Sequence, residues 1–225
     1  MTSTAVAAKF DIKKDMPGLY SPRKGVIEHV LVPQLTYVAI SGKGSPDGAE
    51  FQTAMGALYA VAYPLKFHSK KTLGRDYTVG PAEGLWWADD PAAFVSGDTS
   101  QWQWTLLSVV PPWIHETDFA GVLEAAIKKA RAASEADRPE DSGRNLVQAL
   151  DHVRLLTLTE GECLQVLHIG PYSAEGEILR KMHDELMPAE GLTFNGPHHE
   201  IYLGDPRRTA PEKLRTILRQ PVRHR

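Results

Sequence analysis

One arrangement of residues occurs twice along the 225 residues of this chain, and it limits the possible folds more than any other feature. In each copy, a strand-like segment runs into a glycine and a short loop, then into a serine suited to cap an amphipathic helix that a proline ends. The matching pieces are residues 35–41 and 163–169 for the strands, Gly42 and Gly170, Ser45 and Ser173, and Pro64 and Pro188. Such an internal repeat predicts two copies of one structural unit.

Further strand-like segments follow each expected helix. They are residues 77–79, 85–88 and 102–110 in the first half, and residues 199–203 and 214–222 in the second half. Each half therefore predicts the order β-α-β-β, and the whole chain an α+β fold. Because an amphipathic layer must bury its apolar face, we expect an antiparallel sheet with helices on one side and two repeats related by a pseudo-twofold axis.

A third helix is expected between the two halves, at residues 118–133, where apolar residues recur with helical spacing. The polar residues 134–143, which include Pro139, predict a loop or linker. We therefore expect one domain over residues 1–225, with repeat one at about 26–115, the connecting helix and linker at 116–150, and repeat two at about 151–225.

The composition is that of an ordinary globular protein, with 42% hydrophobic and 24% charged residues. A net charge of −3 provides no positive field that would attract nucleic acid directly. Residues 1–8 lack the features of a signal peptide, and no apolar run approaches the roughly 20 residues of a membrane span. These features predict a cytoplasmic protein without membrane contact, in which the single cysteine, Cys163, is a buried reduced thiol.

Two polar side chains near the C-terminus are the strongest candidates for a site. Since alternate side chains of a strand share a face, Glu200 and Tyr202 point together, while Ile201 points to the other face. Their Cα atoms should lie about 6.5–7 Å apart, close enough for both side chains to contact one small ligand. The alternative is that this polar face simply meets water, as in many antiparallel sheets.

Five tryptophans lie within 28 residues, which suits either core packing or a stacking surface. Trp102 and Trp104 share a strand face with apolar residues, so we assign both to the core. Trp86 and Trp87 should face opposite ways, so only one of them lines a given cleft surface, and we choose Trp87. Tyr59 and Tyr63, one turn apart on the first helix, are either cleft walls or ordinary packing.

No metal or cofactor is expected. His198 and His199 are neighbours on a strand and face opposite ways, which is poor geometry for one metal ion. The chain also lacks the G-x-S-x-G signature of serine hydrolases and a phosphate-binding P-loop.

Several segments resemble one known family. The run HEIYLGDPRRTAPEKLRTILRQPV, residues 199–222, closely resembles the C-terminal signature of GyrI-like small-molecule-binding proteins. The opening KFDIKKDMPGLYSPRKG, residues 9–25, is similar to the start of the stand-alone branch of that family, and GLWWAD and SVVPPWIHETDF are similar to its central tryptophan segments. The GPY at residues 170–172 supports the resemblance, which covers nearly the whole chain.

The resemblance implies a fold of two β-α-β-β repeats with a ligand cleft between them. Relatives include the drug-binding domains of multidrug-sensing regulators, a small gyrase-inhibitory protein, and stand-alone members that hydrolyse cyclopropane-bearing DNA alkylators of the yatakemycin type. In such relatives, a glutamate at the position of Glu200 is the central polar group of the cleft, with tyrosines and tryptophans around it.

Two functions use the same cleft, and the sequence leaves both open. As a binding module, the chain would hold a planar aromatic or cationic molecule against Trp87, Trp113 and Tyr172. As a hydrolase, it would use Glu200 as general base on a water molecule and Tyr202 as hydrogen-bond donor to the carbonyl oxygen that gains charge. A role in gyrase inhibition is a third possibility. Since no helix-turn-helix is apparent, a regulatory role would need a partner protein; the sequence does not indicate an oligomeric state.

Overall fold

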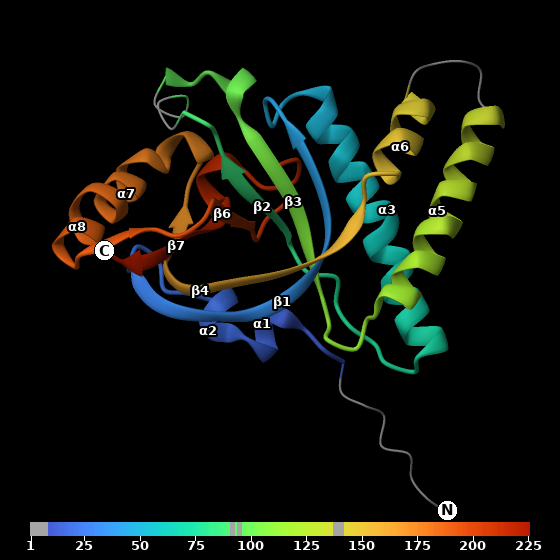
Figure 1. Cartoon of the computed structure of the whole chain (residues 1–225), viewed down its shortest axis with the longest axis horizontal. Helices are drawn as coiled ribbons and strands as arrows, with labels where there is room; N and C mark the ends of the chain where they lie inside the picture. The colour runs from blue at the N-terminus through green and yellow to red at the C-terminus, as the bar shows by residue number, and fades with distance from the viewer. Residues whose placement is uncertain (1–8, 91–92, 94–95, 137–141) are drawn as a thin grey trace, which may run out of the picture.

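The computed structural model describes residues 9–225, except 91–92, 94–95 and 137–141 (Figure 1). Within this part of the chain, seven strands form one sheet in the order β4-β1-β3-β2-β6-β7-β5, and every pairing is antiparallel. The strands are β1 (Glu28–Lys43), β2 (Ala82–Trp87), β3 (Gln103–Val110), β4 (Arg154–Ile169), β5 (Leu192–Phe194), β6 (His198–Tyr202) and β7 (Arg215–His224). Because β4 also pairs with β7, all strands except β5 form a closed ring.

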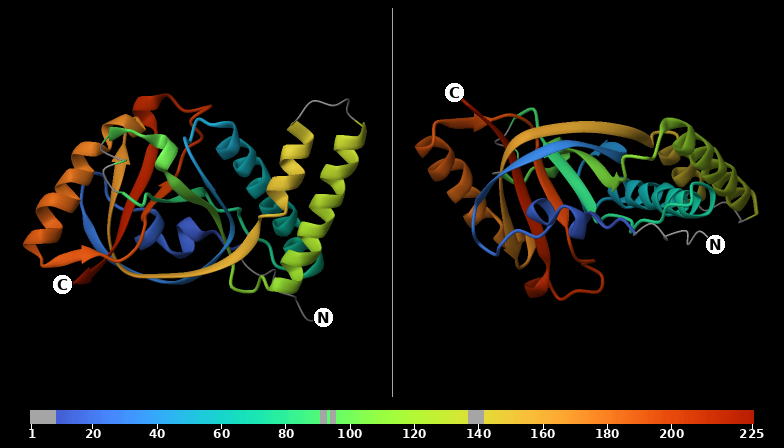
Figure 2. Two further views of the ribbon diagram at one scale, coloured as in Figure 1. Left: turned by 45° about the horizontal axis from the view of Figure 1, so that its top comes forward. Right: turned by 90° about the horizontal axis from the view of Figure 1, so that it is seen from below.

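Helices cover the outside of this ring at two separate places (Figures 1 and 2). One group consists of α3 (Ala49–Thr72), α5 (Glu116–Ala136) and α6 (Ser142–Leu150), which share a core with β1 and β3. The other consists of α7 (Gly176–Arg180), the π-helical turn η3 (Lys181–Leu186) and α8 (Met187–Ala189), which pack on β4 and β7. None of the described helices has the length and apolarity to cross a bilayer. The antiparallel sheet with helices confirms the predicted α+β fold class.

The ring encloses a third core, and we call the face toward it the inner face. The short helices α1 (Ile12–Asp15) and α2 (Pro17–Tyr20) lie against this core and contribute Ile12, Leu19 and Tyr20 to it. Inner and outer side chains alternate along the strands. In β2, for example, Leu85 packs in the inner core, whereas Trp86 packs with the α3 group outside.

Helix α3 continues past the proline that was expected to end it. Pro64 lies inside α3, which runs to Thr72. The buried stripe of the helix continues beyond this proline with Leu65 and Ser69, so tertiary packing offsets the missing backbone hydrogen bond. The predicted cap is also wrong: the residue before α3 is Gly48, and the Ser45 hydroxyl accepts a hydrogen bond from the backbone N–H of Asp47 instead.

The connection between the halves contains one helix more than expected. Helix α5 includes the predicted residues 118–133 and extends beyond them at both ends. Helix α6 was not predicted; it forms because Leu146, Val147 and Leu150 bury one face against the core of the α3 group. Part of the expected linker, including Pro139, falls outside the described residues.

The second half differs in detail from the expected pattern. Ser173 lies in the 3₁₀ turn η2 (Tyr172–Ala174) and does not cap α7, whose preceding residue is Glu175. Pro188 lies within the last turn, α8. In the first half, the strand expected at residues 77–79 is reduced to an isolated bridge between Tyr77 and Phe10. Both halves contain the order strand, helix, strand, strand, but their pseudo-twofold relation remains a prediction.

Two predictions about buried side chains are confirmed. Trp104 is fully buried in the outer core. Cys163 is buried on the inner face, where burial and the charge of Glu160 raise the pKa of its thiol to about 12. The thiol is therefore protonated at neutral pH, as expected of a structural cysteine.

Candidate functional site

Glu200 and Tyr202 share the outer face of β6, between the two groups of helices. The residue between them, Ile201, is fully buried on the inner face. Glu200 lies opposite Gly84 of β2 on one side and Leu218 of β7 on the other. Its side chain is only 18% exposed, so this carboxyl is neither sealed in the core nor on an open surface.

The hydroxyl of Tyr202 is held by a neighbour from β2. The indole Nε1 of Trp86 donates a hydrogen bond of 2.9 Å to it. The Glu200 carboxyl, on the same face two residues before it, is close enough to influence the pKa of this hydroxyl. Gly84 leaves room for this arrangement, because a Cβ at that position would lie 2.8 Å from Nε1 of Trp86 and 3.0 Å from the Tyr202 hydroxyl. Burial and the charge of Glu200 hold the pKa of Tyr202 well above its usual value, so the hydroxyl remains a donor.

The segment that leads into α7 brings a second tyrosine and a second carboxyl to this face. The ring of Tyr172 meets that of Tyr202 edge-on, with 5.9 Å between centroids. Three residues further, Glu175 is 5% exposed, and its Oε1 has no hydrogen-bond partner among the described residues. Burial first, and then the charges of Glu200, Glu175 and Asp205, raise the pKa of Tyr172 to about 12.

The two carboxyls have pKa values close to neutrality. Burial raises the pKa of Glu200 to about 7, although Tyr202 and the charge of His199 oppose the rise. Burial and the charge of Glu200 raise the pKa of Glu175 to about 8. Each group is thus poised to exchange a proton near physiological pH, as candidate acids and bases in binding sites often are.

Two further polar side chains belong to this face. Thr216 of β7 lies opposite Tyr202, is fully buried, and interacts with the carboxyl of Glu175. His198 has two buried ring nitrogens without hydrogen bonds, one of them 3.6 Å from a carboxylate oxygen of Glu200. Burial and the neighbouring His183 and His199 lower the pKa of His198, so its imidazole is neutral at pH 7.

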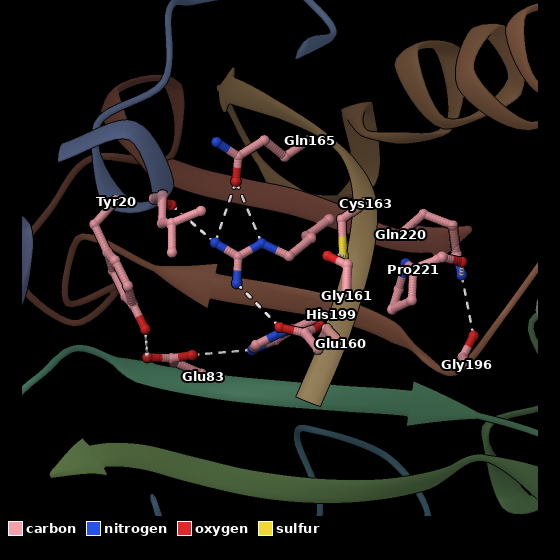
Figure 3. Close-up of polar contacts among 12 residues, drawn as sticks. Tyr20, Glu83, Glu160, Gly161, Cys163, Gln165, Gly196, His199, Gln220 and Pro221 are labelled. Carbon is pink, nitrogen blue, oxygen red and sulfur yellow. Dashed lines mark hydrogen bonds and ion pairs between the residues drawn. The ribbon is translucent and has the colours of Figure 1, made fainter. Parts of the chain in front are cut away.

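On the inner face, directly behind Glu200, His199 belongs to a buried network of ion pairs (Figure 3). Its Nδ1 lies 2.9 Å from Glu160, and its Nε2 lies 3.0 Å from Glu83. Arg219 contacts the other oxygen of Glu160 at 3.2 Å. Glu83 also accepts a hydrogen bond of 2.9 Å from the hydroxyl of Tyr20 in α2.

The N-terminal segment completes this network. Arg219 donates to the backbone oxygen of Leu19 at 2.8 Å and to Oε1 of Gln165, and Gln165 in turn donates to the backbone oxygen of Gly18 at 2.7 Å. The charges balance, with two carboxylates, one guanidinium and one imidazolium. Although burial alone would lower it, the two carboxylates raise the pKa of His199 to about 9, so His199 is charged at neutral pH.

Sequence and structure comparisons identify the family of the chain. No curated protein matches it. The model of the GyrI-like small molecule binding domain matches residues 26–223. The chain belongs to the GyrI-like family.

Solved structures agree with this assignment. An uncharacterized conserved protein from Listeria innocua is 36% identical, with a TM-score of 0.81, and the match covers 96% of this chain and 100% of that one. A structure described as a hydrolase from Listeria innocua has the same identity and coverage and a TM-score of 0.76. The C-terminal domain of EcmrR, 9% identical with a TM-score of 0.50 over 89% of this chain and 99% of that one, shares the fold alone.

In this GyrI-like chain, the structure separates the two predicted tryptophans from Glu200. Trp87 lies on the inner face with the enclosed core, so Trp86, rather than Trp87, is the tryptophan beside Tyr202. A ligand contact by Trp87 remains a prediction from the sequence. Trp113 lies elsewhere, with its Nε1 donating to Ser69 near the end of α3 and the guanidinium of Arg75 4.1 Å from its ring centre.

The two predicted tyrosines of α3 divide between two places. The pKa of Tyr59 is influenced by the backbone of Ala82, which pairs with Tyr202, so Tyr59 lies near the Tyr202 end of β6. Tyr63 is 5.7 Å from the Tyr59 ring, is half exposed, and lines a groove of about 1,040 Å³ between α3, α5 and α6. The structure thus brings Glu200, Tyr202, Tyr172 and Tyr59 toward one region and places Trp87, Trp113 and Tyr63 outside it.

Four residues of the candidate site were not predicted from the sequence, namely Trp86, Glu175, His198 and Thr216. Two of them could have been found from the sequence. Trp86 lies on the same strand face as Gly84, whose missing side chain leaves room on the outer face, and Glu175 follows closely after the GPY segment. No local signal marks Thr216, since its position depends on the pairing of β7 with β6.

The described residues contain no group of three or more His, Cys, Asp or Glu side chains arranged to hold a metal ion.

Proposed function

We propose that this GyrI-like chain binds planar aromatic or cationic molecules beside Glu200, between α3 and α7. The observation that carries the proposal is a largely buried carboxyl on the same face as Tyr202, whose side chain contacts Trp86 of β2 and Tyr172 of η2. Membership of a small-molecule-binding family supports it.

The chemistry of the site favours a flat cation. A positive charge would supply the partner that the Glu200 carboxylate lacks, since a buried carboxylate is stable only when it is paired or hydrogen-bonded. The rings of Tyr172 and Tyr59 would add stacking and cation–π contacts of about 0.5–2 kcal/mol each. Few exact polar matches are needed, so several ligands of this class should bind.

Titration of a planar fluorescent cation into the protein tests the proposal. Glu200→Gln should weaken the binding of the cation, because the charge of the partner is lost. Glu212→Gln is a matched control, since Glu212 is exposed and the change in net charge is the same. Equal affinity of the two variants for the cation would contradict a central role of Glu200.

A second candidate function is hydrolysis of cyclopropane-bearing alkylators. Two observations favour it, the 36% identity to a structure described as a hydrolase and the pKa of Glu200 near 7. Glu200 would take a proton from a water molecule as the water oxygen bonds to the strained ring. The ring C–C bond would break, its electrons would pass through the conjugated system to the carbonyl oxygen, and Tyr202 would hydrogen-bond that oxygen while solvent supplies its proton.

Mass spectrometry separates the two functions. An alkylator incubated with a catalytic amount of protein should gain one water if the chain is a hydrolase. Protection in proportion to the protein, without product, would support binding alone. Glu200→Gln should abolish turnover and retain much of the affinity for neutral ligands; turnover at the original rate would show that Glu200 is not the base.

A further inference from the structure

The helices outside the ring form a groove of about 1,040 Å³ between α3, α5 and α6 (Figure 1). None of the residues that line it belongs to the site beside Glu200. Tyr63 and Phe67, one turn apart on α3, form one wall of the groove and are 52% and 48% exposed. Recesses of this size that are lined by aromatic and apolar side chains are typical of sites for small molecules.

The opposite wall, on α5, explains why the two rings are only half covered. It consists mainly of small residues such as Gly121, Ala125 and Ala133, while Val122 and Leu150 are buried along the groove. Because the small residues have no side-chain atom beyond Cβ, they cannot reach across to the rings of α3. The sequence thus leaves a slot with one aromatic wall and one smooth wall, into which a flat ring system can insert and stack.

The charged groups of the groove favour an acidic ligand over a basic one. Asp118 is the only carboxyl among the described lining residues, and both of its oxygens are engaged. Its Oδ1 lies 3.0 Å from Nε2 of His68, and its Oδ2 accepts a hydrogen bond of 3.1 Å from the backbone N–H of His115.

Lys129 supplies the free charge. It lines the groove and takes part in none of the ion pairs between described residues. The groove therefore offers a ligand one ammonium group and no free carboxylate, which is the reverse of the site beside Glu200. A ligand with one negative charge complements it.

We propose that this groove binds flat aromatic molecules that carry one acidic group. The ring system lies between the wall formed by Tyr63 and Phe67 and the smooth wall of α5. Lys129 is one turn, or about 6 Å, beyond Ala125 on α5, so its ammonium group reaches an acid at the edge of a ligand held there. This second site goes beyond the proposed function and does not depend on it.

Titrations with three fluorescent probes of one shape test the charge preference. Pyrenecarboxylate is an anion, pyrenemethanol is neutral, and pyrenemethylammonium is a cation. In the groove, the anion should bind about two- to fivefold more tightly than the alcohol, because one exposed ion pair contributes little. Glu200→Gln should leave the affinity for the anion unchanged, so failure of this inference and failure of the proposed function are distinguishable.

Variants place the probe against the aromatic wall. Phe67→Ala should weaken binding of both the anion and the alcohol by on the order of tenfold, because a stacking partner is lost. Phe194→Ala is the control, since Phe194 is 52% exposed but lies outside the groove, and it should bind both probes as the wild type does. Both changes are at half-exposed positions, so the variants should fold.

A second pair of variants tests the acid contact. Lys129→Gln should weaken the anion about two- to fivefold and leave the alcohol unchanged. Lys128→Gln is the matched control, because the neighbouring Lys128 is exposed, does not line the groove, and changes the net charge equally.

Three results would overturn the inference. Equal affinity of Lys129→Gln and Lys128→Gln for the anion would remove the acidic ligand class. Unchanged binding of both probes by Phe67→Ala would place them outside the groove. A wild-type dimer in light scattering that excludes the probes and dissociates in Phe67→Ala would show that a second copy of the chain occupies the groove instead.

Discussion

Trp86 and Tyr202, on neighbouring strands, are joined by a hydrogen bond in which the indole N–H donates to the hydroxyl oxygen across 2.9 Å. Burial and the charge of Glu200 raise the pKa of this hydroxyl, so it stays protonated and can donate to a ligand. The bond from Trp86 therefore sets the position of the Tyr202 donor before any ligand arrives, which is how a binding site avoids reorganisation.

Gly84→Ala should disturb this pair. The added Cβ would lie 2.8 Å from Nε1 of Trp86 and 3.0 Å from the Tyr202 hydroxyl, so one of the two rings must move. We expect a loss of ligand affinity of roughly tenfold, as one hydrogen bond of about 1–1.5 kcal/mol is broken. Gly56→Ala in α3 is the control, since nothing lies within 4 Å of the added carbon there, and it should leave binding intact. Equal binding by the two variants would show that the Trp86–Tyr202 geometry is not needed.

Replacing each tryptophan of the adjacent pair should separate binding from stability. Trp86→Phe removes the donor to Tyr202 and should weaken ligand binding. Trp87→Phe alters packing on the inner face, so it should lower the free energy of unfolding without changing ligand affinity beyond the effect on folding. Affinity measurements and urea denaturation of both variants check this. Weaker ligand binding by Trp87→Phe together with unchanged binding by Trp86→Phe would indicate that Trp87, rather than Trp86, contacts the ligand.

Arg219→Met should destabilise the protein strongly. It removes the guanidinium that donates hydrogen bonds to Glu160, Gln165 and the backbone of Leu19. Removing one partner of a buried ion pair typically lowers the free energy of unfolding by about 3–5 kcal/mol. Arg223→Met, an exposed change on the same strand, is the control and should lie within about 0.5 kcal/mol of the wild type. Urea denaturation measures both, and similar unfolding midpoints for the two variants would contradict a structural role for the network.

The ligand-free protein should be most stable in mildly acidic solution. Glu160 has a lowered pKa of about 2, so its contribution is present above pH 4.5 and is lost as pH falls toward 2. Glu200 and Glu175 have pKa values raised from 4.5 to about 7 and 8, and His199 has one raised from 6.5 to about 9, so the contribution of each group is lost as pH rises from its ordinary pKa to its raised pKa. Urea midpoints measured from pH 4 to 9 should therefore decline from about pH 5 upward. A Glu175→Gln variant should decline less, and a flat profile for the wild type would contradict the raised pKa values.

Much of the fold was predictable because it depends on local periodicity. The alternation around Glu200 and Tyr202 places both side chains on one face, and the apolar stripes of α3 and α5 give helices close to the expected ones. The end of α3 was mistaken because the burial of Leu65, beyond Pro64, is a tertiary effect. Likewise, α6 depends on contacts with α3 and α5 rather than on its own residues.

The composition of the site was less predictable, because it depends on pairing between distant strands. Strand alternation predicts that Trp86 and Trp87 face opposite ways. Which of the two lies beside Tyr202 depends on the register of β2 with β6. The closure of β4 onto β7 was not anticipated, and it creates the enclosed interior in which Glu160, His199 and Arg219 meet.

The match to the family model begins at residue 26, but residues before it pack against the enclosed core of the ring. Gly18 and Leu19 provide backbone oxygens to Gln165 and Arg219, and Tyr20 provides a hydroxyl to Glu83. A protein trimmed to residues 26–223 would keep Glu200, Tyr202 and Tyr172 but would lose one acceptor of the buried Arg219 guanidinium and the phenol that donates to Glu83. Residues 18–20 therefore contribute to the stability of the enclosed core although they lie outside the matched segment.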